Sequence, residues 1–472
     1  MPHDLPAPLS RRQMLRQCCA GFGNLALLGL MSSIERAAAA QAKLNPLAAR
    51  PPMLPARAKR VIFLFMHGGP SHVDTFDYKP SLIRDSGKPL PFDKPRIQFA
   101  KTSNLRKSPW EFKPYGQSGA MVSDLFPLVG ACADDICFLK SIHGTNEAHG
   151  GALLKLHTGS DTFVRPSMGS WISYGLGTEN QNLPSFITIN PTQGHGGVGN
   201  WSSAFLPAVH QGTPIGGGMP VEKATINYLH DPNSDDNPSL QRAQLDLLGE
   251  MNRQHLARAG AAPALEARIE SFELAFRMQT EAPEAMNVAA ESEATQKLYG
   301  LDDPKTASFA RQCLLARRFS ERGVRFVQVT HGYWDQHEDL TKDHARLAFE
   351  VDRPIAGLLR DLKARGMLND TLVLWGGEFG RTPTLQGKDG RDHHPHGFTM
   401  WMAGGGVKGG FSYGVTDEYG FYCVDQKVHV HDLHATILAL LGLDHERLTY
   451  RYAGRDFRLT DVSGRVVKEI FV

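Results

Sequence analysis

The sequence predicts an α/β fold in which a mostly parallel sheet lies between layers of helices. Residues 61–66 are six apolar residues in a row, a pattern typical of a strand buried on both faces. From residue 309 onward, short apolar strand patterns alternate with longer helical patterns. Alternation of this kind indicates a parallel sheet that is covered by helices.

The individual elements can be placed from their local patterns. The predicted strands are residues 61–66, 136–139, 186–189, 325–329, 371–375 and 400–403. Residues 123–139 fit a helix that leads into the second of these strands, and further helices are predicted at 309–322, 342–366 and 431–441. The 342–366 helix has the clearest pattern, because six apolar residues share one stripe at helical spacing: Leu347, Val351, Ile355, Leu358, Leu359 and Leu362.

We expect one large domain at 59–472, preceded by a linker rich in Pro and Ala at 41–58. A helical insertion is predicted at about 239–297, where strand patterns stop and Ala, Leu, Glu, Gln and Arg dominate. Four of the six cysteines lie beyond residue 40, too few for a disulfide framework in a chain of 472 residues. Cys132 and Cys137 could pair across a short loop, although two packed free thiols are the preferred interpretation.

Residues 1–40 have the pattern of a twin-arginine signal peptide. Arginines at 11 and 12 precede an apolar stretch at 18–31, and four alanines at 37–40 offer cleavage sites. We therefore expect the twin-arginine translocase as a partner during export and no permanent membrane span. The mature protein is expected to be periplasmic or secreted, and export of a folded chain suits a metal loaded in the cytoplasm.

Composition and missing motifs exclude several classes of protein. The 51 Lys and Arg residues nearly balance the 49 Asp and Glu residues, so the chain lacks the basic surplus that nucleic-acid binding requires. No Gly-x-Gly-x-x-Gly or Gly-x-Ser-x-Gly sequence joins a predicted strand directly to a predicted helix, and His-Glu-x-x-His does not occur. The Gly-rich stretches at 194–199 and 216–218 lack a P-loop lysine and are interpreted as flexible loops.

Several polar residues lie at the ends of predicted strands, where ligands bind in open α/β sheets. His67, Asp335, His337 and Glu378 each follow a strand, and the Asp-His-His-Pro-His sequence at 392–396 precedes one. Imidazole and carboxylate groups together suit zinc, manganese or iron. Two such ions would orient a phosphate or sulfate ester for hydrolysis.

Three of the motifs also occur in a known family. They are Phe-Leu-Phe-Met-His-Gly-Gly-Pro-Ser at 63–71, Gly-Gly-Glu-Phe-Gly-Arg-Thr-Pro at 376–383 and Gly-Arg-Asp-His-His at 390–394. In this order they resemble the DUF1501 family of exported bacterial proteins, which is related to sulfatases within the alkaline phosphatase-like superfamily. The resemblance runs from about residue 60 to the C-terminus. It implies a three-layer α/β/α sandwich with a metal site at the carboxyl ends of the strands.

The resemblance also implies which residues bind the metal. The superfamily's first-strand Asp falls on His67, its strand-ending Asp-His falls on Glu378 and Phe379, and its last His is matched by His394 or His396. The implied metal ligands are His67, Asp335, His337, Glu378, His394 and His396. They would hold one or two divalent ions, with zinc, manganese or calcium as the candidates. Asp392 and His393 are expected to orient the ligating imidazole.

The position of the sulfatase nucleophile, counted back from the Thr-Gly pair at 158–159, falls on His149. A slip of three residues places it on Asn146 instead. Neither side chain has a hydroxyl group that could form a covalent intermediate. We therefore expect water activated by the metal to attack, with His149 or Asn146 beside the metal. Thr145 and Ser71 remain as alternative nucleophiles.

The resulting hypothesis is an exported metal-dependent hydrolase of sulfate or phosphate esters. Its expected partner is an anionic ester, including sulfated or phosphorylated glycans. Arg381 is expected to hold the anionic group, because a planar guanidinium pairs bidentately with tetrahedral oxyanions. The alternative is a non-catalytic envelope protein of the same fold that binds glycans or partner proteins, since a hydroxyl nucleophile is missing.

Export by the twin-arginine route gives the first testable prediction. Replacing Arg11 and Arg12 together with Lys should leave the precursor in the cytoplasm, because this route depends on the arginine pair. N-terminal sequencing of the wild-type protein from envelope or medium fractions should begin near Gln41. Unchanged export of the double variant would contradict the assignment.

Overall fold

The computed structural model describes most of the chain beyond the predicted signal peptide. The described residues are 46–472, except 94–100, 218–225, 227–228, 230–236 and 260–262. The predicted signal at 1–40 thus lies outside them. Within the described part, no helix combines the length and apolar character that crossing a membrane would need.

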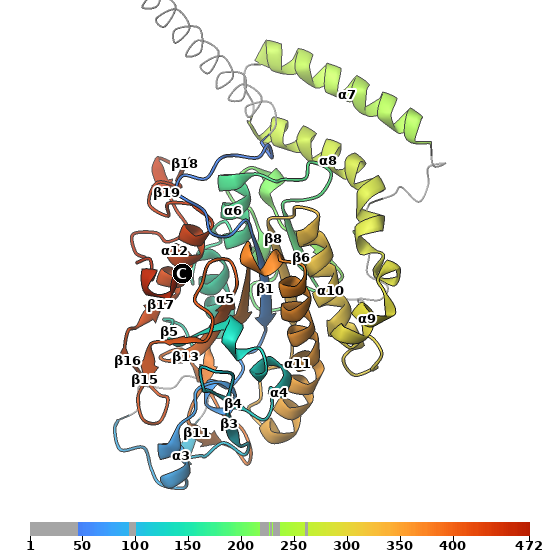
Figure 1. Ribbon diagram of the computed structural model, residues 1–472. Helices are drawn as coiled ribbons and strands as arrows, with labels where there is room; N and C mark the ends of the chain where they lie inside the picture. The colour runs from blue at the N-terminus through green and yellow to red at the C-terminus, as the bar shows by residue number, and fades with distance from the viewer. Residues whose placement is uncertain (1–45, 94–100, 218–225, 227–228, 230–236, 260–262) are drawn as a thin grey trace, which may run out of the picture.

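A nine-stranded sheet forms the centre of the fold (Figure 1). Its strands are β1 (Arg60–Met66), β5 (Ile136–His143), β6 (Phe186–Ile189), β7 (Thr213–Ile215), β8 (Phe326–His331), β9 (Thr371–Gly376), β13 (Phe398–Ala403), β14 (Phe411–Tyr413) and β17 (Val428–His429). The order is β14-β5-β13-β9-β1-β8-β6-β7, and β17 also pairs with β5. β1 is parallel to both β8 and β9, whereas β13 is antiparallel to β9 and β5. The predicted, mostly parallel sheet is confirmed.

Helices cover both faces of this sheet, as predicted (Figure 1). Successive residues of β1 point to opposite faces, so they belong to different cores. Ile62 and Leu64 share one core with α10 (Ala307–Glu321) and α11 (Leu340–Ala364). Phe63 and Phe65 share the other core with α5 (His149–Thr158), α6 (Met168–Leu176) and α12 (Val430–Leu440). The fold is therefore a three-layer α/β/α sandwich.

The segment predicted as an insertion is helical, and its first helix stands away from the sandwich whereas its second packs against it (Figure 1). It comprises α7 (Pro238–Ala259) and α8 (Pro263–Met286), and α9 (Glu293–Tyr299) follows. Arg242 on α7 pairs with Glu273 on α8 at 2.8 Å, which joins the two helices.

The remaining elements are α2 (His72–Thr75), α3 (Pro80–Arg84), α4 (Pro127–Gly130) and the short strands β2 (Thr102–Leu105), β3 (Phe112–Tyr115), β4 (Ala120–Ser123), β10 (Gly380–Arg381), β11 (Thr384–Gln386), β12 (His393–His394), β15 (Val415–Thr416), β16 (Cys423–Asp425), β18 (Tyr450–Tyr452) and β19 (Arg455–Phe457).

One local prediction was wrong. The segment 123–139 forms only the short α4 and a 3₁₀ turn before β5, because Pro127 and Gly130 confine the helix to one turn. The described part of the predicted linker packs against the domain, where Leu47 is buried and the Leu54 amide donates to the Gly442 carbonyl. The cysteine interpretation is confirmed, since all four described cysteines are free and buried.

A buried ion pair ties the segment after β1 to the motif before β13. Asp74 Oδ2 accepts a 2.7 Å hydrogen bond from Arg391 Nε, and both side chains are fully buried. Burial raises the pKa of Asp74, but the charge and hydrogen bonds of Arg391 outweigh it, so the net pKa is lowered. This pair therefore holds two segments at the edge of the sheet against each other.

The fold depends on this pair in a testable way. Asp74→Asn should lower the free energy of unfolding by about 3 kcal/mol, because it leaves the Arg391 charge buried without its counter-ion. Since the folded pKa is lowered, the stabilisation is present above the unfolded pKa and is lost as pH falls through the folded one. Urea midpoints at several pH values measure both effects.

The matched control is Asp456→Asn, which breaks the exposed pair between Arg451 and Asp456. Exposed pairs contribute less than about 1 kcal/mol, so its urea midpoint should stay near that of the wild type. Equal effects of the two substitutions would contradict the role assigned to the buried pair.

Candidate active site

The sheet topology gathers the chemically active residues along one edge. β1, β8 and β9 are parallel, so the residues that follow them meet at their carboxyl ends. β13 runs the opposite way, so the residues that precede it, 392–396, reach this same edge. Three separated motifs therefore converge, as the sequence predicted.

Three potential ligand atoms form a tight triangle at this edge. His337 Nε2 and His393 Nε2 each lie 3.0 Å from Asp335 Oδ1, and the two nitrogens are 3.0 Å apart. Two ligand atoms at about 2.1 Å from one ion and at right angles to each other would lie about 3 Å apart. The spacing therefore suits a single divalent ion, and Asp392 lies close enough to join His337 and His393 in such a group.

The outer nitrogens of both rings support this interpretation. His393 Nδ1 lies 2.7 Å from the Glu147 carbonyl oxygen, and His337 Nδ1 lies 2.7 Å from Gln386 Oε1. Both oxygens can only accept, so each Nδ1 donates its proton and each neutral ring has a lone pair on Nε2. Imidazoles that bind metals use their second nitrogen in this way. A cation or an additional proton is needed where these lone pairs meet the carboxylate.

Asp335 is ionised in this surrounding. Burial raises the pKa of its carboxyl group, but the contacts with His149, His337 and His393 and the charge of Arg381 outweigh burial and hold this pKa well below its usual range. Its hydrogen bond with His337 raises the pKa of that imidazole, whereas burial lowers the pKa of His393. The carboxylate is thus a negative charge to which positive groups are drawn.

His149 links the two carboxylates of the site. It begins α5, with Nδ1 2.8 Å from Glu378 Oε1 and Nε2 3.1 Å from Asp335 Oδ2. The second contact lacks hydrogen-bonding geometry. Burial lowers the pKa of His149, but Asp335 and Glu378 outweigh it and raise the pKa to about 9. An imidazolium therefore stands between the two carboxylates.

Glu378 lies beneath His149 and supports it. Its side chain is fully buried, and both carboxylate oxygens accept from the Gly68 amide, at 3.0 and 3.2 Å. Gly68 has a φ of +114°, and a Cβ there would lie 2.6 Å from the Asp335 amide nitrogen. A glycine is thus required for the two loops to approach. Glu378 orients His149, although it was expected to bind the metal.

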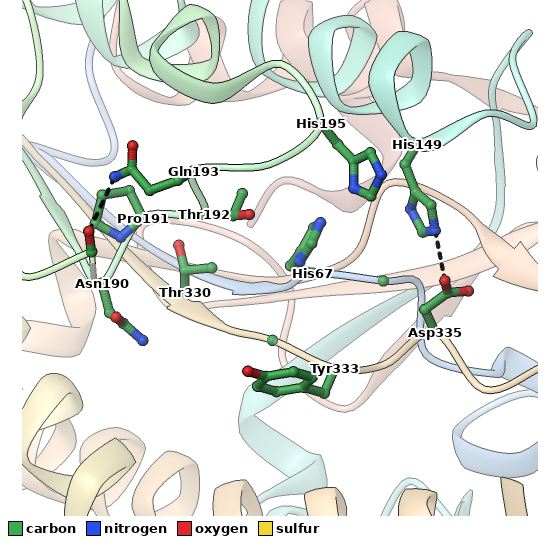
Figure 2. Close-up of a pocket in the computed structure, with 13 residues that line it drawn as sticks. His67, His149, Asn190, Pro191, Thr192, Gln193, His195, Thr330, Tyr333 and Asp335 are labelled. Carbon is green, nitrogen blue, oxygen red and sulfur yellow. Dashed lines mark hydrogen bonds and ion pairs between the residues drawn. The ribbon is translucent and has the colours of Figure 1, made fainter. Parts of the chain in front are cut away.

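His67, His149 and His195 form a second group on the wall of a cavity. One nitrogen from each ring lies within 4.8 Å of the others, and buried His67 Nε2 has no hydrogen-bond partner. Burial lowers the pKa of His67, which keeps this ring neutral near pH 7. Figure 2 shows the three rings gathered at one end of the cavity, with Asp335 beside His149. The cavity has a volume of about 370 Å³.

The expected anion-binding role of Arg381 is contradicted. Its guanidinium is fully buried, and its donors contact the carbonyl oxygens of Gly68, Gly69, Trp334 and Arg391 and the carboxylate of Asp335. The side chain has no exposed surface that a substrate could contact. Arg381 instead fixes Asp335 and joins the loops that follow β1, β8 and β9.

The structure also corrects the positions of two predicted metal ligands, His394 and His396. In the ribbon of β10 and β12, Arg381 is opposite His393, and both reach Asp335. His394 is the next residue of the strand and points to the other face, where Nε2 donates to the Phe421 carbonyl. His396 packs beside Phe421, outside the metal-binding groups of the described residues.

The predicted alternatives to His149 lie outside the triangle as well. Asn146 Oδ1 accepts from the Ala148 amide at 2.9 Å and shapes the turn before α5. The Ser71 hydroxyl is buried and donates to Asp74 at 2.5 Å, so no substrate can reach it. Thr145 Oγ1 donates to Asp161 at 3.3 Å. Among these candidates, His149 is the residue placed in the site.

Sequence reasoning missed His195 and placed His393 only in an orienting role. His195 lies in the Gly-rich stretch at 194–199, which was interpreted as a flexible loop. Its left-handed backbone, with a φ of +44°, brings the ring beside His149, with ring centroids 4.8 Å apart. The sequence signal that could have identified His195 is a histidine inside a glycine-rich loop that follows a predicted strand.

A comparison with protein families identifies the family of this chain. A family model described as a protein of unknown function (DUF1501) matches residues 58–471. The chain belongs to the DUF1501 family. The search of curated proteins found no match.

Solved structures that are similar to this DUF1501 chain include enzymes of ester hydrolysis. The sulfatase PsFucS1 from Pseudoalteromonas sp. is 12% identical, with a TM-score of 0.33 and coverage of 83% of this chain and 69% of that one. The phosphonate monoester hydrolase SpPMH from Silicibacter pomeroyi is 13% identical, with a TM-score of 0.35 and coverage of 73% and 71%. A protein in the alkaline phosphatase superfamily from Vibrio parahaemolyticus is 9% identical, with a TM-score of 0.34 and coverage of 84% and 70%. These values are too low to transfer an activity.

The charge of His149 in the DUF1501 chain can be measured directly. In metal-free protein, its imidazole should stay protonated up to about pH 9, since two carboxylates surround it. Because the folded pKa is raised, its stabilising effect is complete below the unfolded pKa and is lost as pH rises through about 9. NMR titration of the histidine side chains measures this pKa.

Glu378→Gln should lower the pKa of His149 in the same titration, because it removes one of the two charges. His445→Gln changes a histidine elsewhere and serves as the control. A His149 pKa near 6.5 in the wild type would contradict the arrangement.

Proposed function

We propose that this protein is an exported, metal-dependent hydrolase of sulfate or phosphate esters. The observation that carries the proposal is the triangle of His337 Nε2, His393 Nε2 and Asp335 Oδ1, with edges of 3.0 Å. Both imidazoles are already held by their outer nitrogens, as in metal sites. The triangle lies beside the cavity, so a substrate can reach it.

The proposed metal site holds one ion through His337, His393 and Asp335. Two nitrogens and one carboxylate oxygen favour zinc or manganese, whereas calcium prefers oxygen ligands alone. Asp392 supports the site, because its Oδ1 accepts from the His393 amide at 2.9 Å. Buried Asp392 Oδ2 has no hydrogen-bond partner, which leaves an additional negative charge to balance a cation.

The anionic group of the ester is proposed to bind between His67, His149 and His195. His67 Nε2 is buried and unpartnered, so an ester oxygen would satisfy it. The amino-terminal end of α5, where His149 stands, adds the positive end of a helix dipole. This group takes over the task that the sequence assigned to Arg381.

The chemistry divides between the ion and the side chains. A bound divalent ion polarises an ester and lowers the pKa of an attacking water. His149 holds a proton at Nε2, and Glu378 fixes the ring through Nδ1, so this proton can pass to the leaving oxygen. Arg381 keeps Asp335 in place throughout. No covalent intermediate is required, which agrees with the lack of a hydroxyl group at position 149.

The missing hydroxyl also favours a second candidate, a non-catalytic envelope protein that uses this cavity to bind glycans or partner proteins. Both candidates place the mature chain in the periplasm or outside the cell, as the sequence at 1–40 predicts. They differ in whether an ester is turned over. Metal content and activity therefore have to be measured separately.

The metal site predicts a stoichiometry. Wild-type protein, reloaded and washed with a weak chelator, should hold about one equivalent of zinc or manganese, because such sites bind with about 10 kcal/mol or more. His337→Ala and His393→Ala should each hold less than about 0.2 equivalents, since one of three ligands is lost. Elemental analysis by mass spectrometry is the measurement.

His394→Gln and His396→Ala are the matched controls for metal content. His394 is adjacent to His393 but points to the opposite face, and His396 packs on Phe421. Both variants should keep the wild-type content. Loss of metal in His394→Gln but not in His393→Ala would place the site on the other face and overturn the proposal.

Turnover is the test of the enzyme itself. Metal-loaded protein should hydrolyse at least one of aryl sulfate, aryl phosphate, phosphate diester and phosphonate ester substrates. His149→Gln should lower kcat by a factor of about 100 or more, because it removes the proton donor. Metal-bound wild-type protein without turnover on the whole panel would favour the non-catalytic alternative.

A further inference from the structure

The cavity beside the metal site has two chemically different ends. His67, His149, His195 and Asp335 lie at one end, and neutral residues line the other (Figure 2). The neutral lining consists of Asn190, Pro191, Thr192, Gln193, Gly217, Thr330, Gly332 and Tyr333. Among the described lining residues there is no Lys or Arg. The second end therefore suits an uncharged group with many hydrogen-bonding atoms.

Tyr333 is an exposed aromatic residue on the rim of this neutral end. Its exposed fraction is 82%, although the next residue, Trp334, is completely buried. Trp334 anchors the turn, because its amide donates to the His67 carbonyl at 3.1 Å and its Nε1 donates to His331 Nδ1. The Gln336 side chain also donates to the Tyr333 carbonyl. The aromatic ring is thus exposed on a fixed turn.

Backbone strain is concentrated around the same cavity. Asn190, His195 and Tyr333 all line it, and they have φ values of 53°, 44° and 72°. A left-handed backbone is uncommon for residues other than glycine and is costly for a tyrosine. The surrounding contacts nevertheless hold Tyr333 in this conformation, which keeps its ring at the rim.

Thr330 provides a second, independent observation that points to a ligand at the neutral end of the cavity. Its exposed fraction is only 3%, and its Oγ1 is buried without a hydrogen-bond partner although the residue lines the cavity. A buried hydroxyl without a partner costs free energy, so a ligand hydroxyl is its natural complement. The amides of Asn190 and Gln193 lie at the same end and can both donate and accept.

We propose that the neutral end binds a pyranose ring, so that the substrates are sulfated or phosphorylated glycans. The ring stacks on Tyr333, and its hydroxyl groups bond to Thr330, Asn190 and Gln193. The ester group of the same sugar then reaches the three imidazoles and the metal site. The volume of about 370 Å³ is within the range of small-molecule sites. A nucleotide fits less well, because its phosphates call for the Lys or Arg that the described lining residues lack.

The proposal rests on the proposed function for hydrolysis, but the binding of a neutral sugar can be tested without turnover. An array of neutral, sulfated and phosphorylated oligosaccharides of glucose, galactose, mannose, xylose and N-acetylglucosamine is probed with metal-loaded wild-type protein. The best neutral ligand is then titrated by calorimetry against the variants. Thermal melting confirms that each variant is folded.

Tyr333→Ala should weaken glycan binding about tenfold, because it removes the stacking surface. Tyr333→Phe should bind within about threefold of the wild type, since the aromatic face is kept. Thr330→Val should also weaken binding, because it removes the hydroxyl but keeps the shape. Tyr452→Ala, which changes an exposed tyrosine that does not line the cavity, is the control and should bind like the wild type.

The outcomes separate this inference from the proposed function. The absence of binding to every sugar, unchanged binding by Tyr333→Ala, or displacement of the sugar by adenosine would each overturn the glycan subsite, even if aryl esters are hydrolysed. Tyr333-dependent binding of a neutral sugar supports the subsite, even if no ester is turned over. His393→Ala should retain this binding, because the metal site lies at the other end of the cavity.

Discussion

The carboxylate of Asp335 concentrates negative charge where three imidazoles and one guanidinium meet. His149, His337, His393 and Arg381 all contact this group. In such a partly buried position the attraction is stronger than in water, so the charge must be matched by protons or by a metal ion. The segments after β5, β8 and β9 and the segment before β13 each contribute one of the matching groups.

The antiparallel direction of β13 makes this convergence possible. In a fully parallel sheet, residues that precede a strand lie at the opposite edge from residues that follow its neighbours. β13 pairs antiparallel with β9 and β5, so the segment before it returns to the edge where β1, β8 and β9 end. β10 and β12 then form a short ribbon that places Arg381 and His393 side by side. One reversed strand thus completes the site.

Close packing beneath the site limits how far the loops can move. Gly68 approaches Trp334 and Asp335 so closely that a Cβ would collide with their backbone. Arg381 joins carbonyl groups of these loops, and buried Asp74 holds Arg391 nearby. A rigid frame of this kind keeps ligand atoms at fixed separations before a ligand arrives, which reduces the cost of binding. The same frame holds Tyr333 exposed at the rim of the cavity.

The sequence by itself determined the sandwich and the three motifs that meet at its edge. Continuous apolar runs identify buried strands, and residues at strand ends share an edge whenever the strands are parallel. It also predicted His67, Asp335 and His337 at this edge and His149 beside the metal. These inferences depend on local patterns, which can be read directly from one amino-acid sequence.

Tertiary structure alone decided which face each residue of a motif presents. His393 and His394 are neighbours of the same type, and only the pairing of β12 with β10 turns the first toward Asp335. Arg381 could bind an anion from its chemistry, yet the carbonyl groups of distant loops occupy its donors. Leu47 of the predicted linker is buried for the same kind of reason. Such outcomes depend on contacts between residues far apart in the chain, and local composition does not reveal these contacts.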